Sequence, residues 1–184
     1  MEVLKTKDLV VGYKEKAILP PINVTLYEGS MIALIGPNGA GKSTLFKTLT
    51  AHIKAVSGEI ELFGKELNSY SAKEKATIIG LVLTERPDDM FLKVFDVVAS
   101  GRCPYTNFFG KIREEDETII KESLEIVGIN HLSDRYFSAL SDGERQKVMI
   151  AKTIAQNTPI ILMDEPAAGI DYPGKIERFN VMKK

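Results

Sequence analysis

The stretch that most constrains the fold is a glycine-rich loop at residues 36–44, which reads Gly-Pro-Asn-Gly-Ala-Gly-Lys-Ser-Thr. It fits G-x-x-x-x-G-K-[ST], a phosphate-binding pattern in which glycines let backbone N–H groups approach an anion closely. The apolar run 31–35 before the loop predicts a buried strand, and the apolar spacing over 43–53 predicts a helix. The positive end of that helix dipole would then face the phosphates. This order of elements predicts an α/β nucleotide-binding domain.

The loop also supplies the side chains that phosphate chemistry needs. Lys42 is expected to contact the β- and γ-phosphates and to stabilise charge during phosphoryl transfer, and Ser43 to place its hydroxyl on Mg²⁺. The alternative, a chance match to the pattern, is disfavoured by the strand and helix predicted on either side. The predicted phosphate-binding residues are Gly36, Pro37, Asn38, Gly39, Ala40, Gly41, Lys42, Ser43 and Thr44.

Length and composition exclude several other classes of protein. A chain of 184 residues that is 44% hydrophobic is long enough for one globular domain with a sizeable core. The net charge of −1 gives no reason to expect nucleic acid as the main partner. A single cysteine, Cys103, rules out an internal disulfide and suits a reducing compartment. We expect no signal peptide, and no apolar run approaches the length of a membrane span.

Other segments fill in the architecture around the loop. Antiparallel β structure is predicted over residues 2–14, 22–28 and 60–64. Buried strands are predicted at 78–83 and 160–163, with a loop over 84–93. Helices are predicted at 71–77, 94–99, 113–127 and 141–156. Strands that alternate with helices predict a largely parallel core sheet with an antiparallel β subdomain, and the helical stretch 94–156 reads as an inserted lobe.

Two acids follow the predicted strand 160–163. A carboxylate at the carboxyl end of a parallel strand lies where α/β sheets bind ligands. Asp164 is therefore expected to hold Mg²⁺, in the Walker B role. Glu165 is expected to orient or deprotonate the attacking water. The alternative is a strand-end acid pair in a turn before Pro166.

Residues 140–144, Leu-Ser-Asp-Gly-Glu, resemble the signature motif Leu-Ser-Gly-Gly-Gln of the ATP-binding-cassette (ABC) ATPases, with departures at Asp142 and Glu144. The sequence S-x-x-E is also a helix capping box, and both interpretations can hold. The resemblance implies that Ser141 and Gly143 meet the γ-phosphate bound by a second ATP-binding subunit. We expect that subunit to be another copy of this chain, with ATP and Mg²⁺ as cofactors.

The resemblance covers essentially the whole chain. Tyr13 matches the aromatic residue that stacks on adenine, although an ordinary strand tyrosine would look the same. Residues 166–171 resemble the loop that places Asp171 toward the partner subunit. A GTPase is disfavoured because the sequence has no Asn-Lys-x-Asp motif.

Two positions depart from the family pattern. The family usually has glutamine at the end of the second core strand, where this chain has Thr84 followed by Glu85; Thr84 is expected to reach a metal-bound water. The family also has a further strand and a γ-phosphate-contacting histidine after the expected helix 172–184. His52 and His131 lie elsewhere in the sequence and cannot take that role.

We therefore interpret residues 1–184 as a single ABC domain that is incomplete at its C-terminus. Its ATPase core is expected to comprise 1–93 and 157–184, and its helical lobe 94–156. The missing strand is expected to leave an open sheet edge, and the missing histidine to allow ATP binding with little hydrolysis.

The lobe suggests which kind of ABC protein this is. Residues 101–105, Gly-Arg-Cys-Pro-Tyr, and 108–110 resemble a stretch of importers for iron–siderophore, haem and cobalamin, although a turn with packed aromatics would also fit. The resemblance implies an ATPase that powers an importer, bound through permease subunits at the cytoplasmic face of the inner or plasma membrane. A non-transport ABC ATPase and a nucleotide-binding module without turnover remain alternatives.

Overall fold

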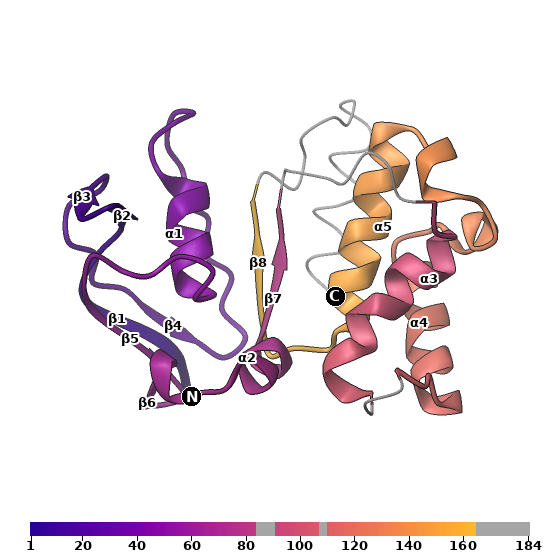
Figure 1. The fold of residues 1–184 in the computed structure, drawn as a ribbon, viewed down its shortest axis with the longest axis horizontal. Helices are drawn as coiled ribbons and strands as arrows, with labels where there is room; N and C mark the ends of the chain where they lie inside the picture. Colours follow the sequence, from indigo (N-terminus) through magenta and orange to yellow (C-terminus); the bar gives the residue numbers. More distant parts are fainter. Residues whose placement is uncertain (84–90, 107–109, 165–184) are drawn as a thin grey trace. The chain divides into compact units, whose positions relative to one another are not determined.

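The computed structural model describes residues 1–83, 91–106 and 110–164. The chain forms two compact units, Met1–Leu81 and Val82–Lys184. Figure 1 traces them from the indigo N-terminus to the yellow strand near residue 160. Within the described part of the chain, no helix has the length and apolarity that crossing a membrane requires.

The first unit is built on an antiparallel sheet. Its strands β1 (Glu2–Val10), β4 (Thr25–Tyr27), β5 (Ser57–Leu62) and β6 (Lys65–Glu66) are ordered β4-β1-β5-β6 (Figure 1). The turn from β5 to β6 has φ values of 50° at Phe63 and 74° at Gly64, as a two-residue hairpin turn matching the sheet twist requires. The antiparallel β structure predicted from the sequence is confirmed.

The first unit also contains a short hairpin and helix α2. Strands β2 (Gly12–Tyr13) and β3 (Lys16–Ala17) pair with each other. Helix α2 (Ala72–Ile78) follows the 3-10 turn η1 (Leu67–Ser69), and Ser71 and Glu74 form a capping box at its N-terminus.

Helix α1 (Lys42–Leu49) is shorter than predicted. The amide of Ala51 bonds to the Thr48 carbonyl and that of His52 to the Lys47 carbonyl, with Ala51 at φ 58°. This is the pair of bonds that closes a helix C-terminus around a left-handed residue.

The predicted buried strand at residues 31–35 is wrong for this structure. No strand of the described chain pairs with these residues, and the side chains of Met31, Ile32, Leu34 and Ile35 are 61%, 56%, 44% and 91% exposed. Apolar composition indicates that a segment can be buried, but a strand also needs a neighbour for its backbone N–H and C=O groups. The sequence shows the apolar composition of residues 31–35, but it does not show whether another strand lies beside them.

The second unit has a helical core. Helices α3 (Val94–Ala99), α4 (Glu114–Ile126) and α5 (Asp142–Ala155) pack against one another (Figure 1). Short 3-10 helices connect them: η2 (Ser100–Tyr105), η3 (Asn130–Leu132) and η4 (Phe137–Ala139). Side chains buried in this core include Val94, Val97, Ile120, Leu124, Phe137 and Val148.

Strands β7 (Ile79–Val82) and β8 (Ile160–Met163) form a two-stranded sheet. The amide of Asp164, just after β8, donates to the carbonyl of Val82, the last residue of β7, at 2.8 Å. Both strands therefore end side by side, as in a parallel pair. The predicted strands 78–83 and 160–163 are confirmed, whereas the predicted division into 1–93, 94–156 and 157–184 stays a prediction.

Replacing Gly58 with alanine is expected to destabilise the first unit by about 2–4 kcal/mol. Gly58 has φ 84°, and an added Cβ would lie 2.3 Å from the carbonyl oxygen of Asp8, where the β1–β5 register shifts. Gly64→Ala is the matched control, because Gly64 also has positive φ but open space around it. Urea unfolding of both variants measures the difference, and equal losses would show that the clash is relieved without cost.

Candidate nucleotide-binding site

The glycine-rich loop leads directly into the N-terminus of α1. Gly39 and Gly41 have φ values of 79° and 91°, and Gly41 is the N-cap residue without any side-chain cap. A Cβ on Gly41 would lie 2.9 Å from Cγ2 of Ile18, so another residue here would have a strained backbone and would displace the Ile18 side chain. The first helical bond runs from the Leu45 amide to the Gly41 carbonyl. The N–H groups of the preceding helical residues thus have no acceptor within the helix and are available to an anion.

Lys42 lies across this loop. Its Nζ donates hydrogen bonds to the carbonyl oxygens of Gly36 and Pro37, each at 2.9 Å. Ser43 is exposed at the same helix end, and Thr44 is buried. A bound phosphate would replace two neutral carbonyl acceptors with charged oxygens, which form stronger bonds to an ammonium group.

The other residues predicted to bind nucleotide or metal lie outside the glycine-rich loop. Tyr13 lies on β2 in the same unit as the loop and is 49% exposed. Asp164 follows β8 and is only 4% exposed, so a carboxylate does stand at the end of this strand. The roles of Tyr13 in adenine stacking and of Asp164 and Ser43 in metal binding stay predictions. Thr84, Glu85, Glu165, Asp171 and the expected helix 172–184 lie outside the described residues.

Ser141 caps helix α5, as predicted, with Gly143 in the first turn. One carboxylate oxygen of Glu144, Oε2, accepts the Ser141 hydroxyl at 2.7 Å and the Ser141 amide at 2.8 Å. The Glu144 amide in turn points to the Ser141 hydroxyl at 3.4 Å. These hydrogen bonds from Ser141, with smaller contributions from the charges of Arg135 and His131, hold the pKa of Glu144 below its ordinary value.

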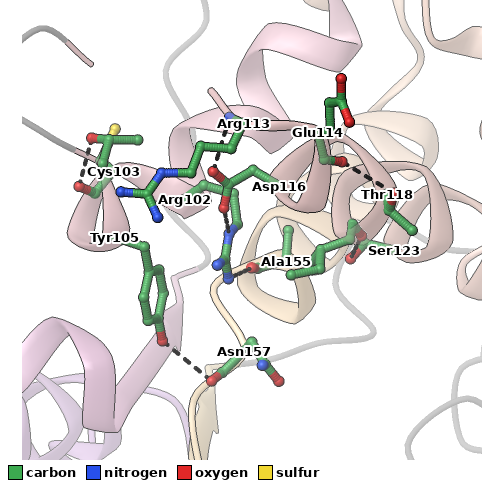
Figure 2. Close-up of polar contacts among 12 residues, drawn as sticks. Arg102, Cys103, Tyr105, Arg113, Glu114, Asp116, Thr118, Ser123, Ala155 and Asn157 are labelled. Atoms are coloured by element: carbon green, nitrogen blue, oxygen red, sulfur yellow. Dashed lines mark hydrogen bonds and ion pairs between the residues drawn. The ribbon is translucent and has the colours of Figure 1, made fainter. Parts of the chain in front are cut away.

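A buried ion pair anchors the stretch 101–105. Figure 2 shows Arg102 of η2 pointing at Asp116 of α4, with Nε 2.8 Å from Oδ1. Arg102 also donates to the carbonyl of Ala155 at 2.9 Å, and the second Asp116 oxygen accepts the Arg113 amide at 3.1 Å. Both charged residues are about as buried as core leucines, at 6% and 5% exposed. The acidic start of α4 is therefore not solvated throughout, because Asp116 is buried.

Further contacts hold the stretch 101–105 against the helical lobe. The guanidinium of Arg102 lies over the Tyr105 ring, 4.0 Å from its centroid, and the Tyr105 hydroxyl donates to the Asn157 carbonyl at 3.3 Å (Figure 2). A Cβ on Gly101 would lie 2.3 Å from the Lys152 carbonyl oxygen, so α5 passes directly against this turn. Cys103 is exposed. The turn is thus packed on the lobe, while its outer edge remains on the surface.

The pairing of Arg102 and Asp116 was missed because the two residues are far apart in sequence and look like ordinary surface charges. Asp116 is one of four consecutive acids that favour the start of a helix. Arg102 lies in a turn that contains Gly101 and Pro104. The only signal in the sequence was an arginine inside a turn, between Gly101 and the pair Cys103-Pro104.

Comparison with known proteins identifies relatives of this chain. Residues 19–168 match the ABC transporter family model. The chain is 42% identical, over 99% of its length, to an uncharacterized ABC transporter ATP-binding protein of Methanocaldococcus jannaschii. It is 34% identical to the iron(3+)-hydroxamate import ATP-binding protein FhuC of Bacillus subtilis, over 100% of its length, and 34% identical to the ferric enterobactin transport ATP-binding protein FepC of Escherichia coli, over 98%. It spans 63%, 68% and 67% of these three relatives.

Solved structures give the same answer for the fold. A nucleotide-free ATP-binding cassette matches 100% of the chain with a TM-score of 0.85 and 25% identity, the chain covering 76% of it. The ADP conformation of another cassette of an ABC transporter matches 100% of the chain with a TM-score of 0.83 and 26% identity, with 76% of it covered. The predicted α/β fold with a P-loop core is confirmed. The chain belongs to the ABC transporter family.

Proposed function

We propose that this chain is the ATP-binding and hydrolysing part of an importer for iron–siderophore or related metal chelates. The observation that carries the proposal is the loop 36–41, whose left-handed glycines leave the N-terminus of α1 open beside the Lys42 ammonium. Two of the relatives are named for iron–hydroxamate and ferric enterobactin transport, which supports the substrate class.

ATP would be held by the residues of the loop. Lys42 and the backbone N–H groups would bind the phosphates, and Tyr13 would stack on adenine. The groups proposed to hold Mg²⁺ are hard oxygen donors, namely the Ser43 hydroxyl, the Asp164 carboxylate and the Thr84 hydroxyl, and Mg²⁺ prefers donors of this kind. Mg²⁺ when bound would neutralise charge on the phosphate oxygens.

Hydrolysis would need Glu165 and a second subunit. Glu165 would orient or deprotonate the attacking water, and Lys42 would stabilise charge on the transferring phosphoryl group. Ser141, Gly143 and Asp171 would face the nucleotide bound by a second copy of the chain. The turn 101–105, whose outer edge is exposed, would contact a permease at the cytoplasmic face of the membrane.

Replacing Glu165 with glutamine is expected to preserve ATP binding and to trap an ATP-dependent dimer. The neutral amide cannot accept the proton of the attacking water, so the bound nucleotide persists. Size-exclusion chromatography with light scattering measures the dimer, and Glu117→Gln, an exposed glutamate on α4, is the control. Absence of the ATP-dependent dimer in Glu165→Gln would contradict its role. Co-purification with ribosomes or DNA, instead of a membrane permease, would favour a non-transport ATPase.

A further inference from the structure

We infer that Glu144 is an internal competitor of phosphate at the N-terminus of α5, and that it weakens ATP-driven association of two copies of the chain. The inference rests on the proposed function, because it concerns the contact between Ser141 and a nucleotide held by the partner. It adds a residue that sets the strength of that contact. Glu144 is in this sense a positioning residue, which acts through Ser141.

The geometry shows that the donors at Ser141 are already taken. A serine hydroxyl carries a single proton, and Ser141 gives it to Glu144 Oε2 at 2.7 Å. The Ser141 backbone amide gives its proton to the same oxygen at 2.8 Å. A phosphate oxygen arriving at this helix end would need the hydroxyl proton for its own bond. Two anions therefore compete for one donor.

The competitor is charged at neutral pH. The hydrogen bonds from Ser141 lower the pKa of Glu144 from its ordinary value, and Arg135 and His131 lower it further. Asp142 adds a second carboxylate to the same helical turn and is exposed. The first turn of α5 thus presents acidic groups where an incoming phosphate would bring further negative charge. Like charges brought together oppose binding.

Phosphate contact at Ser141 therefore requires a local rearrangement. Either the Ser141 hydroxyl rotates away from Glu144, or the Glu144 side chain leaves the helix end. Each route breaks a charge-assisted hydrogen bond that is already formed, so part of the energy of phosphate contact is spent on releasing it. A neutral acceptor at position 144 would form a weaker hydrogen bond with Ser141, and it would also remove the charge repulsion toward the phosphate.

Glu144→Gln separates charge from capping. The glutamine Oε1 can accept the same two hydrogen bonds, so the helix end keeps its partners while the negative charge is lost. The matched control is Glu74→Gln in α2, where Ser71 and Glu74 form the same capping box, with the Ser71 amide bonded to Glu74 Oε2 at 2.7 Å. Hydrogen bonding from Ser71 likewise lowers the Glu74 pKa. Any change in capping stability should therefore be similar in the two variants.

The experiment measures dimer formation against the concentration of the non-hydrolysable analogue AMP-PNP with Mg²⁺. Glu144→Gln is expected to form the dimer at about tenfold lower analogue concentration than the unchanged protein. Glu74→Gln should keep the unchanged midpoint. Binding of the analogue to monomers, measured by calorimetry at low protein concentration, should be equal in all three.

The outcomes separate this inference from the proposed function. An unchanged or weaker midpoint for Glu144→Gln, with analogue binding intact, overturns the inference and leaves nucleotide binding at the loop in place. An equal shift in Glu74→Gln also overturns it, because general loss of capping would then be the cause. Absence of analogue binding in all three proteins would instead overturn the proposed function.

Discussion

Replacing Lys42 with alanine is expected to lower ATP affinity at least about a hundredfold, because the ammonium would donate charge-assisted bonds to the phosphates worth about 1.5–3 kcal/mol each. Lys42 supplies this charge from the first position of α1, directly beside the open helix end. Isothermal titration calorimetry with MgATP measures the change. ATP affinity within twofold of the unchanged protein would contradict the assignment of the loop.

The fold should survive this substitution. Among the described residues, Lys42 donates to the carbonyls of Gly36 and Pro37, in an exposed loop where water can take over both bonds. The far-UV circular dichroism spectrum and the urea midpoint are therefore expected to stay the same. Lys54→Ala, an exposed lysine shortly after α1, is the matched control and should bind ATP normally.

Replacing Arg102 with methionine is expected to reduce the free energy of unfolding of the second unit by about 3–5 kcal/mol. The methionine fills part of the space, but the Asp116 carboxylate is left buried without its cation and the Ala155 carbonyl without its donor. Burial by itself raises the pKa of Asp116, and the hydrogen bonds from Arg102 and the Arg113 amide outweigh burial and hold that pKa below its ordinary value. Urea unfolding followed by circular dichroism measures the loss.

Two further variants test the cause of that loss. Arg102→Met combined with Asp116→Leu removes both charges and should recover most of the lost stability, because an apolar pair can fill a buried site as well as an ion pair does. Lys93→Ala removes one partner of an exposed pair with Asp134 and should change stability by less than about 0.5 kcal/mol. A loss under about 1 kcal/mol for Arg102→Met would mean that water reaches Asp116 and solvates it.

The candidate site was predictable where its chemistry is local. The loop 36–44 and the two capping boxes, Ser71 with Glu74 and Ser141 with Glu144, depend on residues at most a few positions apart. Glycine conformation and capping hydrogen bonds act over that distance, so their sequence patterns carry the structure directly. The bounds of α3 and α5 followed in the same way from helical periodicity and caps.

By itself, then, the sequence determined the phosphate-binding loop, the helix ends and the strands β7 and β8. Only the tertiary structure decided that residues 31–35 have no strand partner among the described residues, and that Arg102 finds Asp116 in the core. Both depend on which distant segments meet, and a charged or apolar side chain looks the same in sequence whether a partner reaches it or water does. Pairing of distant groups is set by packing of the whole unit, which no local pattern records.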